Sequence, residues 1–190
     1  MPTEVHEFDW PDRVVVGTVG RPGERTFYLQ VRTGARSASV AIEKEQSALL
    51  AEKIDELLAE VVAEGDGSVT VPAETPAELV DNDPLDQPVE EQFRAGAMRL
   101  GWDRSTSQVV IEAYPLELAD AQPDDADAVD LPDAEPVEPA EMLLVRIPVG
   151  TARAFVERTR QVVRAGRPAC PLCGEPVDVD GHVCASPDVV

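Results

Sequence analysis

The stretch SASVAIEKEQSALLAEKIDELLAEVV, residues 37–62, decides the predicted fold because its pattern changes from that of a strand to that of a helix. Small and β-branched residues dominate its first seven positions, which is typical of a strand. Apolar residues then recur at intervals of three and four, so one face of an amphipathic helix is apolar. Gly65 ends this predicted helix. The apolar face consists of Leu49, Leu50, Ile54, Leu57, Leu58, Val61 and Val62.

The same order of elements is predicted twice along the chain. Two strands, at residues 13–20 and 25–32, precede the quoted stretch, and turns that contain Gly separate the strands. The second half has three predicted strands, at 91–102, 108–115 and 141–148, followed by a helix at 151–166. We therefore expect an α+β fold, in which a duplicated strand-strand-strand-helix unit forms a mostly antiparallel sheet with two helices on one face.

Acidic residues are concentrated in two stretches that are rich in Pro and Ala. The net charge is −21, and residues 64–91 and 117–141 contribute −19 of it, because neither stretch contains Lys or Arg. Segments of this composition bury little apolar surface, so we expect both to be solvated and disordered. The predicted divisions are a first half at 1–65, an acidic Pro-rich linker at 66–91, a second half at 92–167 with a disordered loop at 117–141, and a zinc-ribbon-like tail at 168–190.

The tail contains a predicted metal site in CPLCGEPVDVDGHVC, residues 170–184. Cys170 and Cys173 form a knuckle, and His182 and Cys184 lie on the same side of an extended segment. Three sulfurs and one imidazole are the ligand count of a closed tetrahedral Zn²⁺ site, and a closed site is structural because no position is left for water. The alternatives are metal-free thiols or a redox pair, although a redox Cys-x-x-Cys usually begins a helix, whereas here Gly and a turn follow.

Arginines on the second predicted helix form a candidate binding surface. Arg153, Arg160 and Arg164 lie within about 40° of one another around the helix axis, and Arg167 follows them. Guanidinium groups bind phosphate and carboxylate groups, so this face could hold a phosphate-containing ligand or an acidic protein partner. The alternative is a solvated helix face that the acidic loops of the chain neutralise.

Two weaker candidates lie in the first half. Gly17, Gly20 and Gly23 have the spacing of a phosphate-binding loop, but such a loop precedes a helix and this one precedes a strand, which favours a hairpin. His6 stands close to Glu7 and to Asp9, and it is either part of an acid–base cluster or a polar contact at a strand end.

Three segments resemble an uncharacterised family of about this length that is common in high-GC Gram-positive bacteria, the actinobacteria. They are VHEFDWPDRVVVGTVGRPGERTFYLQVR (5–32), PVEEQFRAGAMRLGWD (88–103) and GRPACPLCGEPVDVDGHVC (166–184). The resemblance implies a C-terminal Cys-x-x-Cys and His-x-Cys tail and no established activity. It also implies an association with a histidine-phosphatase-like protein and a distant relative of phosphoinositide kinases, and hence a link to phosphorylation.

Together these features predict a cytoplasmic, non-enzymatic binding or regulatory protein with a structural zinc and a protein partner. No apolar run reaches the length of a membrane span, and the N-terminus lacks the pattern of a secretory signal. One alternative is an enzyme acting on a phosphorylated small molecule, with Arg13, Arg25 or the arginines of the second helix holding the phosphate. Another is nucleic-acid binding through the tail, which the aromatic content of 4% disfavours for single strands.

Overall fold

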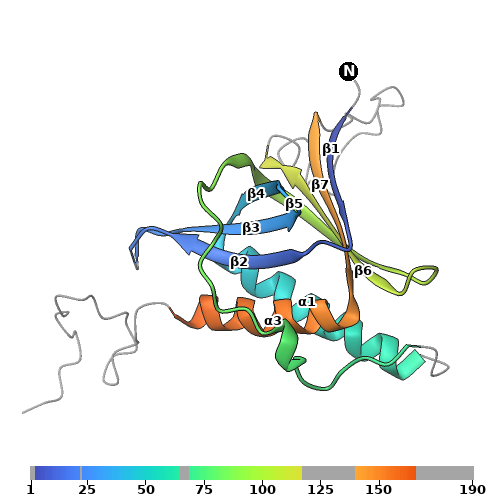
Figure 1. Cartoon of the computed structure of the whole chain (residues 1–190). Helices are drawn as coiled ribbons and strands as arrows, with labels where there is room; N and C mark the ends of the chain where they lie inside the picture. The colour runs from blue at the N-terminus through green and yellow to red at the C-terminus, as the bar shows by residue number, and fades with distance from the viewer. Residues whose placement is uncertain (1–2, 22, 65–68, 117–139, 166–190) are drawn as a thin grey trace, which may run out of the picture.

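The computed structural model describes residues 3–21, 23–64, 69–116 and 140–165 (Figure 1). These residues form a mixed α+β structure with a seven-stranded sheet and two long helices, which confirms the predicted fold class. The elements are β1 (Glu4–Asp9), β2 (Arg13–Val19), β3 (Thr26–Thr33), β4 (Arg36–Ile42), α1 (Lys44–Glu64), the 3₁₀ helix η1 (Ala77–Leu79), β5 (Glu91–Asp103), β6 (Gln108–Pro115), β7 (Glu141–Pro148) and α3 (Val149–Arg164).

One strand was not predicted. β1 has the sequence EVHEFD, in which only Phe8 is fully buried, so its composition does not indicate a strand. It forms because its backbone pairs in parallel with β7, with Glu4 opposite Glu141 and Phe8 opposite Val145. The backbone hydrogen bonds of a neighbouring strand, rather than a side-chain pattern, therefore place this segment in the sheet.

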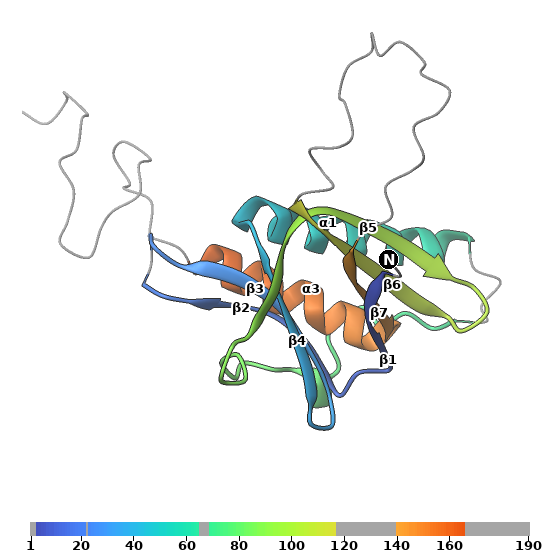
Figure 2. The ribbon, with the colours of Figure 1, turned by 90° about the horizontal axis from the view of Figure 1, so that it is seen from above.

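The strand order is β1-β7-β6-β5-β4-β3-β2, and four of the six described pairs are antiparallel, as predicted. The two edge strands, β1 and β2, are consecutive in the chain and are joined only by residues 10–12. A flat sheet of seven strands would separate its edges by about 29 Å, at roughly 4.8 Å per strand. Three linking residues span at most about 14 Å. The sheet is therefore strongly curved (Figure 2), and Arg36 of β4 donates a hydrogen bond to the Glu7 carbonyl of β1.

Both helices pack against the inner face of this curved sheet (Figures 1 and 2). Leu50, Ile54 and Leu58 are the large buried residues of α1, while Leu49 and Val62 of the predicted apolar face are exposed. The buried stripe is narrower than predicted because positions 49 and 62 lie at its margins. Strands and helices of both halves contribute to one hydrophobic core, so the structure does not show an exact duplication of an independent unit.

The acidic segment after α1 differs most from its prediction. Residues 69–91 were expected to belong to a disordered linker, and this expectation is wrong, because they follow a defined path with hydrogen bonds to β2, β3 and α3. Residues 80–88, which we call the strap, cross the outer face of β2, β3 and β4 before β5 begins (Figure 1, green). The second predicted disordered stretch lies outside the described residues except for its last two positions.

Within the described part of the chain, neither long helix combines the length and the apolar composition needed to cross a membrane.

Candidate functional site

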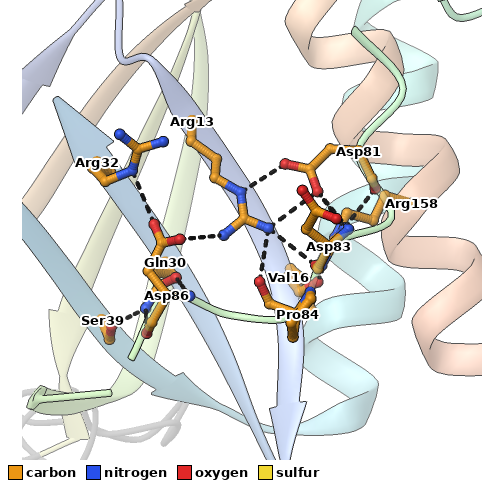
Figure 3. Close-up of polar contacts among 10 residues, drawn as sticks. All are labelled: Arg13, Val16, Gln30, Arg32, Ser39, Asp81, Asp83, Pro84, Asp86 and Arg158. Carbon is orange, nitrogen blue, oxygen red and sulfur yellow. Dashed lines mark hydrogen bonds and ion pairs between the residues drawn. The ribbon is translucent and has the colours of Figure 1, made fainter. Parts of the chain in front are cut away.

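The strap is held on the sheet by Arg13, the first residue of β2 (Figure 3). The Asp81 carboxylate accepts hydrogen bonds from Nε of Arg13 at 2.6 Å and from Nη2 at 3.0 Å. Nη1 donates to Asp86 at 3.1 Å, and Nη2 also donates to the carbonyls of Asp83 and Pro84. Paired Arg–carboxylate bonds of this kind are among the strongest hydrogen bonds in proteins. Arg13 therefore binds the strap at both ends of residues 81–86.

Arg158 of α3 binds the same segment from the other side (Figure 3). It donates to the Asp81 carboxylate at 2.8 Å and to the Asp83 carbonyl at 2.6 Å. Its Nε donates to the Val16 carbonyl at 3.1 Å. Because β2 is an edge strand, its outward carbonyls have no strand partner. Arg158 thus satisfies one of these carbonyls and joins α3, β2 and the strap.

The strap also packs into the outer face of the sheet. Leu85 is buried and lies directly over Gly17, where an added Cβ would come within 2.6 Å of the Leu85 side chain. Gln30 is buried in β3, and its amide accepts from the Asp86 N–H at 2.7 Å and donates to the Asp86 carbonyl at 3.1 Å (Figure 3). The side chain of Gln30 therefore pairs with the strap backbone as a neighbouring strand would.

Asp81, the carboxylate that Arg13 and Arg158 share, has a lowered pKa. Hydrogen bonds from Arg13, followed by the charges of Arg13 and Arg158, hold the pKa of Asp81 below its ordinary value. The hydrogen bond to Asp81 raises the pKa of Arg13, whereas burial lowers the pKa of Arg158. Arginine stays protonated in proteins, so the cluster holds two guanidinium cations around one carboxylate at neutral pH.

Three of the four predicted binding arginines come together in a groove on α3. Arg153, Arg160 and Arg164 line a groove of about 600 Å³ between this helix and the segment that leads to the strap. Arg167 lies outside the described residues. We call this the α3 groove, and its other lining residues are Ala73, Glu74, Thr75, Val80, Val156, Glu157 and Gln161.

Asp55 of α1 orients two of these arginines, and the sequence did not indicate it. Arg160 donates to one Asp55 oxygen at 2.8 Å, and Arg153 pairs with the other oxygen. Arg153 also donates to the Pro72 carbonyl at 3.2 Å. Hydrogen bonds from Arg160 and then from Arg153 lower the pKa of Asp55. In the sequence, Asp55 is an acid on the polar face of a predicted helix. Many solvated acids occupy such positions, so nothing marked Asp55 as part of a site.

One wall of the α3 groove contains an unsatisfied hydroxyl group. The Oγ1 atom of Thr75 is buried and has no hydrogen-bond partner among the described residues. Beside it lies a cavity of about 20 Å³, which Arg158 and Gln161 also line. A cavity of this volume holds about one water molecule.

A second groove, of about 530 Å³, lies where the strap, the start of β2 and α3 meet. Asp12, Glu78 and Asp83 line it together with Arg13 and Arg158. Both of these arginines direct their donors to the strap, so this groove does not offer a free cation to an anionic ligand.

The remaining candidates have internal partners. Arg25 donates to the carbonyls of Val162 and Ala165 at the C-terminal end of α3, which is a favourable place for a cation. His6 contacts Glu141 of β7 at 2.6 Å rather than the two acids close to it in sequence. The glycine-rich segment forms the turn of the antiparallel β2–β3 hairpin, as predicted, and Gly20 adopts a positive φ of 105° there.

No group of three or more His, Cys, Asp or Glu side chains converges on a metal position within residues 3–21, 23–64, 69–116 and 140–165. The predicted zinc ligands Cys170, Cys173, His182 and Cys184 all lie outside these ranges. The chain belongs to a family described as "Protein of unknown function (DUF3090)", whose sequence profile matches residues 6–184. Neither a curated protein nor a solved structure matches the chain.

Proposed function

We propose that this DUF3090 protein is a cytoplasmic, non-enzymatic binding or regulatory protein whose α3 groove receives an acidic segment of a partner protein. The observation that carries the proposal is the convergence of Arg153, Arg160 and Arg164 on one groove. Asp55 is the only carboxylate that bonds to these arginines among the described residues, and it bonds to Arg153 and Arg160. Glu74, Glu157 and Arg164 also line the groove and are exposed, so their charges are screened more than those of the half-buried Arg153 and Arg160.

Two of the arginines expected to hold the phosphate in an enzyme, Arg13 and Arg25, are occupied by contacts within the chain, which leaves the arginines of α3. Arg13 is bonded to the strap, and Arg25 is bonded to the end of α3. The α3 groove, by contrast, presents its arginines from one face of a helix that the hydrophobic core holds in place. Rigid presentation of several charged groups suits recognition of an extended acidic segment.

An acidic peptide tests the binding function. A fluorescent peptide of alternating Asp and Glu should bind in an anisotropy titration, and binding should weaken as salt is added. Replacing both Arg160 and Arg164 with Glu should reduce affinity by about tenfold or more, since like charges then face the peptide. The matched control carries Arg21→Glu and Arg104→Glu, the same change of charge at exposed positions on other elements. An equal loss in both variants, or no binding by the native protein, would refute the proposal.

A structural zinc in the tail is the second part of the proposal. The ligand count and spacing of Cys170, Cys173, His182 and Cys184 fit a closed site. The family match supports it, because it extends to residue 184, the last of these ligands. Such a site would fold the tail that follows α3 and extend the binding surface.

Metal content provides the test of the zinc site. Plasma mass spectrometry of untagged protein, purified with reductant, should find about one zinc per chain, the load of a single four-ligand site. The variant Cys173→Ser should lose the metal while the far-UV circular dichroism of the α+β core stays unchanged. Native protein without zinc would refute this part of the proposal and leave the arginine groove as a separate question.

A further inference from the structure

We infer that the group that the α3 groove receives is a phosphoryl group on a Ser, Thr or Tyr of the partner segment, an inference that rests on the binding function proposed above. Charge is the first argument. Arg153, Arg160 and Arg164 share one bonded carboxylate, Asp55, while the exposed Glu74 and Glu157 line the same groove. A phosphorylated side chain carries about −1.5 to −2 at pH 7, whereas an Asp or Glu carries −1. The phosphoryl group therefore attracts the three arginines more strongly than a carboxylate would, and it competes better with the three carboxylates near them.

The number of hydrogen-bond donors is the second argument. Asp55 already supplies a carboxylate, and each of its oxygens bonds to one of the two guanidinium groups. These two groups therefore meet at one point, with their orientation fixed before any ligand arrives. Each guanidinium has five N–H donors, and the described contacts use two of Arg153 and one of Arg160.

A carboxylate of the partner would offer only two oxygens to these arginines. A phosphoryl group has three oxygens, which suits donors from three arginines. Arg164 follows Arg160 by one helical turn, about 6 Å along the axis, so it supplies the third guanidinium on the same face.

Neighbouring groups on the other elements set how strongly the groove attracts an anion. Glu157 of α3 and Glu74 of the facing segment oppose binding, because both are negative residues of the groove lining. Thr75, whose buried hydroxyl lacks a partner, lies in the same wall beside space for one water. That water would connect the hydroxyl to an oxygen of the ligand. The variant Glu157→Gln should therefore tighten phosphopeptide binding.

The test uses three degenerate peptide libraries that differ only at a fixed central position: phosphoserine, glutamate or serine. Anisotropy titrations with the full chain should show at least tenfold tighter binding of the phosphoserine library than of the glutamate library. The double variant Arg160→Gln and Arg164→Gln should abolish this preference. The control Arg21→Gln and Arg104→Gln should preserve it, because both positions are exposed and lie outside the groove.

The outcomes distinguish failure of the phosphoryl inference from failure of the acidic-partner function. Equal binding of the phosphoserine and glutamate libraries would overturn the phosphoryl inference and leave the acidic-partner function intact. Absence of binding by either library, together with failure of the Asp–Glu peptide, would overturn both. Titration with inorganic phosphate and free phosphoserine distinguishes the source of the group. If either binds as tightly as the phosphoserine library, the ligand is a small phosphate and the partner segment is wrong.

Discussion

Replacing Asp81 with alanine should loosen the strap and destabilise the fold, because one carboxylate holds two partly buried arginines. Asp81 accepts two hydrogen bonds from Arg13 and one from Arg158. The side chains of these arginines are only 9% and 10% exposed, so water replaces the lost carboxylate poorly. The variant leaves two cations close together without the anion between them.

The expected loss of unfolding free energy depends on the hydrogen bonds that Arg13 and Arg158 keep in the variant. Removing one partner of a buried ion pair costs about 3–5 kcal/mol. Asp81 itself is 28% exposed, and Arg13 keeps Asp86 while Arg158 keeps the carbonyls of Val16 and Asp83. These remaining bonds reduce the expected loss of unfolding free energy to about 2–3 kcal/mol.

Urea unfolding followed by far-UV circular dichroism measures this loss, and hydrogen exchange should show faster exchange of the Asp86 amide in the strap. Glu64→Ala is the matched control, because its pairing with Arg104 at 3.4 Å is largely exposed, and it should change stability by less than about 0.5 kcal/mol. If Asp81→Ala were as mild as the control, the arginines would hold the strap through its carbonyls alone, and the role given to the carboxylate would be wrong.

Three other predictions test the packing and the titration. Because the pKa of Asp81 is lowered in the fold, the unfolded chain binds more protons in acid than the folded chain does. The free energy of unfolding should therefore fall as the pH drops below about 5. Urea titrations at several pH values should show a shallower fall for Asp81→Ala than for the native protein. Gly17→Ala should cost about 1–3 kcal/mol because its Cβ would meet Leu85 at 2.6 Å, and a calorimetric scan should find the cost reduced when Leu85→Ala is added. Phe155→Ala should lower the free energy of unfolding in urea by about 3–5 kcal/mol, because this side chain of α3 is buried. Leu49→Ala, at a position of α1 that is 54% exposed, should lower it by less than about 1 kcal/mol. Equal losses would contradict the burial of α3.

Local patterns accounted for most of the secondary structure. The runs of β-branched and aromatic residues in VVVGTV and FYLQV placed β2 and β3, and the three- and four-residue spacing placed α1 and α3. The same helical geometry predicted that Arg153, Arg160 and Arg164 share a face, and all three line one groove. These features depend only on residues within a few positions of one another, which a sequence displays directly.

Features that depend on distant residues were missed. β1 owes its strand conformation to β7, whose residues lie more than 130 positions later in the chain. Asp55 became part of the candidate site only because α1 packs against α3, which brings it to Arg153 across 98 positions. Nothing in either local sequence distinguishes these residues from solvated ones.

The acidic segment at 69–91 shows most clearly what the sequence decides and what the tertiary structure decides. Its composition by itself determined that the segment buries little apolar surface and carries many acidic groups but no Lys or Arg, which led to the wrong prediction of disorder. Only the tertiary structure decided which cations order it, since Arg13 lies 68 positions before Asp81 and Arg158 lies 77 positions after it. The physical reason is that local conformation follows from the periodicity of neighbouring side chains, whereas charge pairing follows from distance in space, which the curvature of the sheet and the packing of α3 set.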